Sequence, residues 1–162
     1  MTKPEVWVVR ADKSIASKVE ESSFLAIGWF EMGDPRELAT KEEFMAKYQF
    51  VYQKNAKRST GVASQLYRFV RDIQKGDLVL TPLSSSREIL IGRVTSDYAY
   101  DETAVSTRYP NIRTVKWLKR VSRDKLSPRL RGSVGSIMTL FKISDYLPEV
   151  EHLLDDRSLD GE

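Results

Sequence analysis

The stretch GDLVLTPLSSSREILIGRV, residues 76–94, determines how the rest of the chain is interpreted. Two apolar runs, DLVLTPL and EILIGRV, flank the polar residues SSSR, which is the pattern of two strands joined by a tight turn. RTVKWLKRV, residues 113–121, follows as a third strand. Residues 76–121 are therefore predicted to form a β meander.

The segments before the meander alternate between strand and helix patterns. VWVVR (6–10) and FLAIGWF (24–30) are short apolar runs typical of buried strands. ADKSIASKVEES between them predicts a helix in which Asp12 or Ser14 is the N-cap. LATKEEFMAKYQFVY predicts a second helix, which begins with the capping box of Thr40 and Glu43.

Three further segments complete the predicted elements. QKNAKRSTG (53–61) is polar and is predicted to be a loop, and SQLYRFVRDI (64–73) has the apolar spacing of a third helix. SRDKLSPRLRG predicts a short helix that Pro128 interrupts. SIMTLFKI predicts the strand that closes the sheet, and a short helix is expected over residues 147–154.

These elements predict one domain of the α/β (α+β) class. Its expected core is a small β-barrel of five to six strands flanked by helices. The chain has 162 residues, 41% of them hydrophobic, which suffices for one core. The predicted domain spans residues 1–154, and residues 155–162 are interpreted as a polar tail that leads to a linker.

The composition argues against an enzyme. Cysteine is absent and His152 is the only histidine, so the sequence offers neither a cysteine-based zinc site nor a convincing catalytic triad. No glycine-rich stretch has the pattern of a phosphate-binding loop, and no Glu-x-Lys follows Asp77 as a metal-dependent nuclease would require. We expect no catalytic residue, no metal and no cofactor.

Length and hydropathy also bear on the compartment. No segment approaches the roughly 18 consecutive apolar residues of a membrane helix, and the N-terminus lacks a secretory signal. We therefore expect a cytoplasmic protein without a membrane partner.

Basic side chains gather in two parts of a chain whose net charge is only +3. The first part has no acidic residue among its five cations, which are Lys54, Lys57, Arg58, Arg68 and Arg71. The second is opposed only by Asp124 and comprises Lys116, Lys119, Arg120, Arg123, Lys125, Arg129 and Arg131. Such stretches bind a phosphate backbone or simply form solvated faces, and two of them on one small domain favour a polyanionic partner.

Trp29 is the aromatic residue best placed for a ligand. It stands at the end of a strand, after Gly28 and before the turn-like MGDP. An indole in that position can stack on a base that has left its helix, or it can belong to the core. Trp7 and Trp117 lie in the middle of apolar strands and are expected in the core.

Four segments resemble the PUA-like superfamily, in particular its EVE and YTH branches. VWVVRADKS is similar to the opening strand of an EVE domain, and IGWF to the strand end that carries a pocket tryptophan. SQLYRFVRDIQKGDLVLTPLSSSREILIGRVTSDYAYD resembles the EVE succession of helix, Lys-x-Gly-Asp-Leu-Val strand and Gly-x-Val strand. RTVKWLKRVSRDKLSPRLR is similar to a YTH strand and short helix, and SIMTLFKI to the closing strand. The overall likeness is to the N-terminal specificity domains of Mrr-type and McrB-type modification-dependent restriction proteins.

The resemblance implies a reader that flips a modified base into an aromatic pocket. Trp29 would be one wall, and Arg10 and Asp12 would lie at the rim. Where YTH domains have a second tryptophan, the chain has Tyr98, Tyr100 and Tyr109, and a tyrosine from this loop would stack on the base opposite Trp29. The predicted pocket also includes Tyr67, so that its tyrosines are Tyr67, Tyr98 and Tyr100. The five cations from Lys54 to Arg71 would hold the phosphates.

The implied ligand is DNA that carries a methylated or hydroxymethylated base. A nuclease or motor of a restriction system would then be a separate domain or subunit. Two alternatives stay open, which are a reader of modified RNA and a non-catalytic protein-interaction domain.

Overall fold

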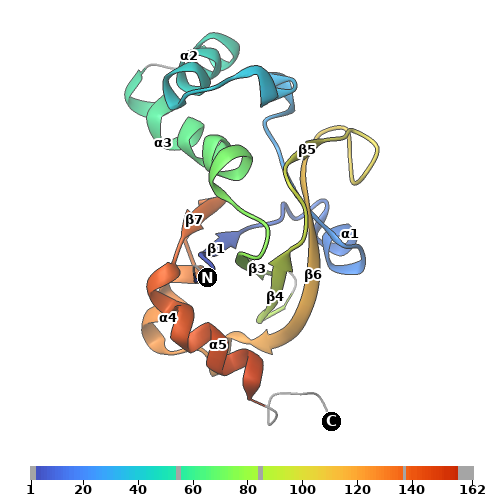
Figure 1. Cartoon of the computed structure of the whole chain (residues 1–162), viewed down its shortest axis with the longest axis vertical. Helices are drawn as coiled ribbons and strands as arrows, with labels where there is room; N and C mark the ends of the chain where they lie inside the picture. Colours follow the sequence, from blue (N-terminus) through green and yellow to red (C-terminus); the bar gives the residue numbers. More distant parts are fainter. Residues whose placement is uncertain (1–2, 54–55, 84–85, 137, 157–162) are drawn as a thin grey trace.

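Seven strands form one curved, mixed sheet in the computed structural model (Figure 1). The model describes residues 3–53, 56–83, 86–136 and 138–156, and for residues 56–60 it describes the backbone alone. The spatial order is β2-β6-β4-β3-β1-β7, with β5 paired to β6. The strands are β1 (Val6–Val9), β2 (Phe24–Ile27), β3 (Leu78–Pro82), β4 (Glu88–Val94), β5 (Ala99–Tyr100), β6 (Asn111–Ser122) and β7 (Leu140–Lys142).

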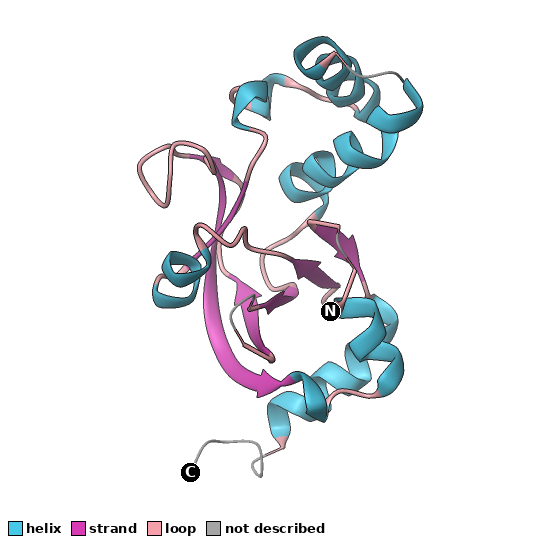
Figure 2. Cartoon of the chain, turned by 180° about the vertical axis from the view of Figure 1, so that it is seen from behind, coloured by secondary structure: helices cyan, strands magenta, loops and turns pink. Residues whose placement is uncertain are grey.

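The predicted meander is confirmed. β3 pairs antiparallel with β4, and β4 pairs antiparallel with β6. β1 joins β3 in parallel, β7 pairs antiparallel with β1, and β2 pairs antiparallel with β6. Because β2 and β7 are the two ends of this order, the sheet is a curled half-barrel, and the long strand β6 gives it its curvature (Figure 2). The predicted α+β class is confirmed.

Helices cover the sheet at both ends and at one side (Figure 1). α2 and α3 lie at one end, α4 and α5 at the other, and α1 beside β6. Their bounds are α1 (Ala16–Glu21), α2 (Lys41–Tyr52), α3 (Ala56–Tyr67), α4 (Pro128–Val134) and α5 (Leu147–Asp155). None of the helices in the described part of the chain has the length and apolar character that a membrane span requires.

The central strands are buried on both faces, which explains why β1 is apolar throughout. Trp7 and Val9 pack toward α2 and α3, whereas Val6 and Val8 pack toward α4 and α5. Trp7 is 1% exposed and donates a hydrogen bond from Nε1 to Asp77 Oδ2 at 3.0 Å, so its predicted place in the core is confirmed. Trp117 is half-buried against the main cluster and the smaller cluster beneath α1.

Gly92 is needed for the sheet to curl. A Cβ atom at this position would lie 2.6 Å from Val115 Cγ2 and 2.7 Å from Trp117 Cε3. The pairing of β4 with β6 also shifts register between Ile91 and Gly92. A residue with a side chain would therefore push β6 away from β4.

The helix boundaries confirm some predictions and correct others. The capping box of Thr40 and Glu43 begins α2 as predicted. The loop predicted over residues 53–61 is wrong in its second half, because α3 begins at Ala56 and the helix-forming Ala, Lys and Arg of that stretch join it. Pro128 does not interrupt a helix but occupies the first turn of α4, where proline has no hydrogen bond to lose.

The first helix also begins later than predicted. α1 starts at Ala16, and its N-cap residue Ile15 makes no side-chain hydrogen bond. The Asp12 carboxylate instead accepts hydrogen bonds from the amide and hydroxyl of Ser14, so it closes a turn before the helix. This leaves Asp12 near the end of β1.

α3 continues into a π-helical turn, η3 (Arg68–Asp72), which a buried arginine secures. The guanidinium of Arg113 donates from Nη2 to Phe69 O at 2.8 Å and to Val70 O at 3.2 Å. Burial lowers the pKa of Arg113 to about 10, so the group stays charged at neutral pH. A cation at the carbonyl end of a helix is electrostatically favourable.

Candidate functional site

A cleft of about 430 Å³ opens where β1 and β2 end. Four parts of the chain meet there: the segment that follows β1, the end of β2, the residue that leads toward β6, and the residue before β7. The lining consists of Arg10, Ala11, Asp12, Lys13, Ala26, Ile27, Gly28, Trp29, Tyr109 and Thr139. Trp29 therefore shares one cleft with Arg10 and Asp12, which come from the segment after β1.

The backbone at Trp29 is unusual for a bulky residue. Its φ of 60° and ψ of 38° place it in the left-handed region, where residues with large side chains are rare. Trp29 O accepts a hydrogen bond from the amide of Met32 at 3.0 Å. Conformations of this kind persist only where the surroundings impose them, and they concentrate at functional sites.

Asn111, the first residue of β6, fixes the turn that carries Trp29. Its side chain is fully buried, and Nδ2 donates to Gly28 O at 2.6 Å. The Oδ1 atom of Asn111 accepts a hydrogen bond from the Tyr98 hydroxyl. Both ends of this amide are thus satisfied, and the strand end before Trp29 is held against β6.

Tyr109 is the second aromatic residue of the cleft. Its ring packs on Gly28, with Cε1 3.5 Å from the position that a Cβ atom of residue 28 would take. The neighbouring Arg108 lies over the Phe30 ring, 5.5 Å from the centroid. Aromatic faces are thereby gathered around the turn that carries Trp29.

Charges of both signs line the cleft. Hydrogen bonds from the side chain and backbone of Ser14 hold the pKa of Asp12 below its usual range, helped by Tyr109 and by the charge of Arg108. Asp12 is therefore an ionised acceptor at neutral pH. The guanidinium of Arg10 donates to Ser136 O at 2.8 Å and to Val134 O at 3.3 Å, so it joins the cleft to the end of α4.

This set of groups is suited to binding. Two aromatic rings can stack on a planar ligand, an ionised carboxylate can accept its N–H groups, and the cations favour an anion nearby. Among the residues that the structure describes, no group of three His, Cys, Asp or Glu side chains is placed to hold a metal ion.

A family model described as "Domain of unknown function (DUF8426)" matches residues 7–144. The chain belongs to the DUF8426 family. No curated protein matches it.

Solved structures similar to this DUF8426 chain include three YTH domain structures. The Mmi1 YTH domain has a TM-score of 0.48 at 10% identity, and the match covers 94% of this chain and 89% of that one. The Mmi1 YTH domain complex with RNA has a TM-score of 0.49 at 9% identity, and the match covers 94% of this chain and 79% of that one. The YTH domain of the Zygosaccharomyces rouxii MRB1 protein in complex with N6-methyladenosine RNA has a TM-score of 0.48 at 10% identity. This match covers 93% of this chain and 86% of that one. The resemblance to Mrr-type and McrB-type proteins stays a prediction.

The other predicted pocket residues of the DUF8426 chain lie outside the cleft lining. Tyr98 packs edge-on against Phe69 with ring centroids 6.2 Å apart, and burial raises its pKa. The Tyr100 hydroxyl donates to Glu102 at 3.2 Å. Tyr67 contacts Phe44 edge-on at 5.3 Å, beneath the α2 helix.

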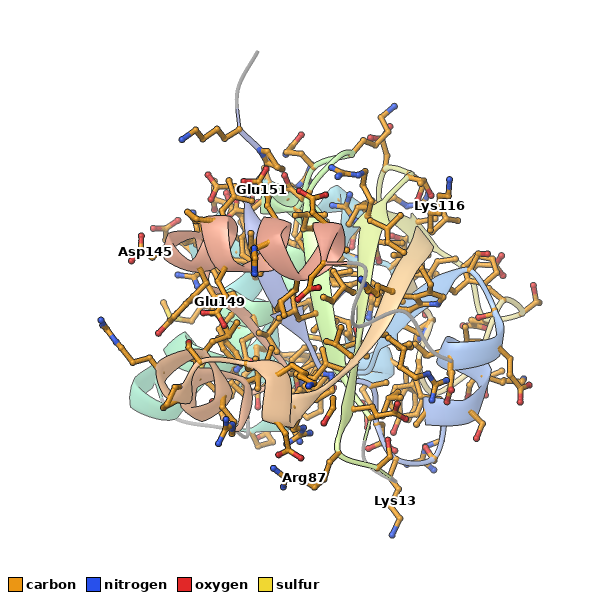
Figure 3. All side chains as sticks on the ribbon, turned by 90° about the horizontal axis from the view of Figure 1, so that it is seen from below. Lys13, Arg87, Lys116, Asp145, Glu149 and Glu151 are labelled. Atoms are coloured by element: carbon orange, nitrogen blue, oxygen red, sulfur yellow. The ribbon has the colours of Figure 1, made fainter. Side chains whose placement is uncertain are left out.

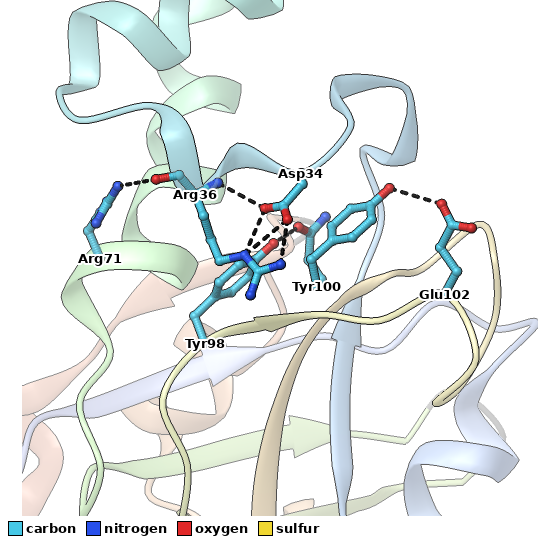
Figure 4. A network of polar contacts seen from close by, with 7 residues as sticks. Asp34, Arg36, Arg71, Tyr98, Tyr100 and Glu102 are labelled. Atoms are coloured by element: carbon cyan, nitrogen blue, oxygen red, sulfur yellow. Dashed lines mark hydrogen bonds and ion pairs between the residues drawn. The ribbon is translucent and has the colours of Figure 1, made fainter.

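Tyr98 and Tyr100 belong to a separate group of polar contacts, shown in Figure 4. We call this group the tyrosine network, and it consists of Asp34, Arg36, Arg71, Tyr98, Tyr100 and Glu102. Arg36 pairs with Asp34, and the pKa of Asp34 is lowered by that contact. Arg71 donates from Nη2 to Leu38 O at 2.6 Å and to Arg36 O at 3.0 Å. The network joins the chain before α2 to the π-helical turn and to β5.

Of the five residues predicted to hold phosphates, the structure describes the side chains of two, Arg68 and Arg71. Arg71 is committed to the two carbonyls, and Arg68 is half-buried in η3. Lys54 lies outside the described residues, as do the side chains of Lys57 and Arg58. Their predicted role stays a prediction.

Tyr109 is the cleft residue that the sequence prediction did not include. It was one of three tyrosines in the same region, and nothing local separated it from Tyr98 and Tyr100. The available signal was its position directly before Pro110 and the strand that begins at Asn111. Such a residue lies at a strand end, as Trp29 does.

Proposed function

We propose that this DUF8426 chain is a non-catalytic reader that takes a modified base of a nucleic acid into the cleft. The observation that carries the proposal is the junction of Trp29, Tyr109 and the ionised Asp12 in one cleft, with Trp29 fixed in a left-handed turn. A base that has rotated out of its strand needs stacking surfaces to replace its lost neighbours. It also needs polar groups that match its edge.

Each group in the cleft has a role in this proposal. Trp29 and Tyr109 supply ring faces for the base and for its added group, and stacking on an aromatic side chain is worth about 1–3 kcal/mol per base. Asp12 accepts from an exocyclic amino group, which cytosine and adenine carry. Arg10 and Lys13 place positive charge where the flanking phosphates approach.

DNA is the polymer that we propose, with the chain as the specificity domain of a modification-dependent restriction system. The support is the overall likeness of the sequence to the N-terminal specificity domains of Mrr-type and McrB-type proteins. Strand cleavage would then belong to a separate nuclease or motor. RNA is the second candidate, because Asp12 is exposed and its carboxylate can accept from a ribose 2′-hydroxyl.

The test is direct binding to a set of short duplexes at one stated salt concentration. The duplexes differ only in one position. One series has cytosine, 5-methylcytosine or 5-hydroxymethylcytosine there, the other has adenine or N6-methyladenine, and RNA strands of matched sequence form a second set. Tryptophan fluorescence reports binding. We expect one modified duplex to bind at least about 10-fold more tightly than the unmodified one, which corresponds to about 1.4 kcal/mol.

The outcomes separate the candidate functions. A preference confined to modified RNA would assign the chain to RNA. Equal binding of every oligonucleotide would end the proposal of a base reader. Salt-sensitive binding to acidic proteins, together with no preference among bases, would indicate a protein-interaction domain.

A further inference from the structure

Four arginines converge beside the cleft from three parts of the chain. Arg10 follows β1, Arg87 precedes β4, and Arg123 and Arg131 lie after β6. The backbone amide of Arg123 donates to Arg87 O at 2.7 Å, and Arg131 Nε donates to Arg123 O at 3.3 Å. We call these four residues the arginine face.

The arginine face has an excess of positive charge. Within the described part of the chain, its one ion pair joins Arg87 Nη2 to Asp124 Oδ1 at 2.8 Å, and the charge of Arg131 also acts on Asp124. One carboxylate therefore stands among four guanidinium groups. By contrast, Arg120 on the neighbouring part of β6 contacts both Glu20 and Glu88.

Arg123 is the residue that this arrangement leaves unsatisfied. Its Nε atom is buried and has no hydrogen-bond acceptor among the described residues. Burial, together with the charges of Arg10 and Arg87, lowers its pKa. Holding a cation in this way costs free energy, because a buried donor without a partner loses its hydration and like charges repel. An anion bound at the terminal nitrogen atoms would offset the repulsion between the like charges.

The arginine face adjoins the cleft through Arg10. This residue lines the cleft, and its guanidinium reaches the carbonyls of Val134 and Ser136 at the end of α4. Figure 3 shows Arg87 and Lys13, another cleft residue, at the same margin of the molecule. Lys116 lies at a different margin in that view.

We propose that the arginine face binds a backbone phosphate of the strand whose base enters the cleft. Guanidinium groups bind phosphate through paired, charge-assisted hydrogen bonds, so the terminal nitrogen atoms of Arg123 and Arg87 would hold it. The proposal rests on the proposed function for the identity of the ligand. It assigns the phosphate contact to the side of β6 and α4, not to the stretch from Lys54 to Arg71.

The test compares Arg123→Gln with Lys116→Gln, which removes the same charge from an exposed site on β6. Each variant is titrated with modified and unmodified duplexes over a range of salt concentrations. We expect Arg123→Gln to weaken binding of both duplexes by about 5- to 10-fold and to reduce the slope of log K against log salt by about 1. Lys116→Gln should stay within about twofold of the wild type, and Arg123→Lys should retain most of the slope.

A second variant distinguishes a loss of phosphate binding from a folding defect. Arg87→Gln alters a side chain that is 66% exposed, and it should reproduce the uniform loss while its thermal unfolding matches the wild type. If Arg123→Gln and Arg87→Gln both bind like Lys116→Gln, the phosphate site is disproved, even where the wild type still selects a modified base. If the wild type binds all duplexes alike but Arg123→Gln loses affinity and slope, the base-reading function fails and the phosphate site stands.

Discussion

The tyrosine network and the cleft with its arginine face are built from the same kinds of side chain, yet they differ in what they leave unpaired. In the network, Asp34 forms an ion pair with Arg36, the Tyr100 hydroxyl donates to Glu102, and Arg71 donates to two backbone carbonyls. Beside the cleft, the charges of Arg10 and Arg87 act on Arg123, and its buried Nε has no acceptor among the described residues. Groups that satisfy one another hold a fold together, whereas an excess of positive charge beside a cleft favours an anionic ligand.

Asn111 bonds to Tyr98 of the network and to Gly28 of the cleft, and its loss should have the largest effect. Asn111→Ala leaves the half-buried Gly28 O and Tyr98 hydroxyl without their partner, the fully buried Asn111 amide. We expect the free energy of unfolding to fall by about 2–4 kcal/mol, since each buried polar group left unpaired costs about 1–3 kcal/mol. Urea denaturation measures this, with Thr107→Ala in an exposed loop as the control.

The same variant also tests the coupling between the regions. Because Asn111 holds the turn before Trp29, the selectivity for a modified base should fall along with stability. A loss of less than about 1 kcal/mol would show that Asn111 does not fix the turn.

Trp29→Ala should act on the cleft and spare the arginine face. We expect the preference for the modified over the unmodified duplex to decrease by about 1–3 kcal/mol, because the stacking surface is lost. Salt-sensitive binding to unmodified duplex should persist. Titration of both duplexes measures the difference, and Trp29→Phe, which keeps a ring, should lose less. Unfolding of Trp29→Ala would instead assign Trp29 to the core.

Tyr98→Phe and Tyr109→Phe form a matched pair that contrasts the two regions. The first removes the hydrogen bond to buried Asn111 and should lower the free energy of unfolding by about 1 kcal/mol without changing base selectivity. The second removes a hydroxyl beside Asp12 and should change selectivity more than stability. Thermal unfolding and duplex titration of both variants test this, and the reverse assignment would place the ligand at the network.

Asp12→Asn should have the smallest effect on stability, and the effect should depend on pH. The folded state lowers the pKa of Asp12, so its ionised form stabilises the fold above the ordinary value of 3.8. That contribution is lost as the pH falls through the lower pKa of the folded state. Because Asp12 is exposed, we expect about 0.3 kcal/mol at pH 7.

The measurement is the free energy of unfolding of wild type and Asp12→Asn at pH 7 and in acid. The difference between them should shrink on acidification. Ser14→Ala removes the hydroxyl hydrogen bond to Asp12 and keeps the backbone amide hydrogen bond, so it should reproduce part of the effect. A difference that is constant with pH would show that the ionisation of Asp12 is not linked to folding.

The sequence by itself determined the elements whose causes lie in neighbouring residues. The strand pair around SSSR, the capping box of Thr40 and Glu43, and the position of Trp29 at a strand end all follow from local periodicity and local hydrogen bonding. The polar composition of the residues after Gln53 predicted a loop, but from Ala56 onward these residues belong to α3. Helix propensity is one of several local signals, and polarity alone does not separate a loop from a solvated helix.

Only the tertiary structure decided which of several similar residues share a site. The curl of the sheet brings Tyr109 against Gly28 while Tyr98 turns inward to Asn111, although these tyrosines looked equivalent along the chain. In the same way, folding commits Arg71 to backbone carbonyls and sets Arg123 among like charges. Charge and aromaticity are properties of single residues, but their availability depends on the partners that distant strands and helices supply.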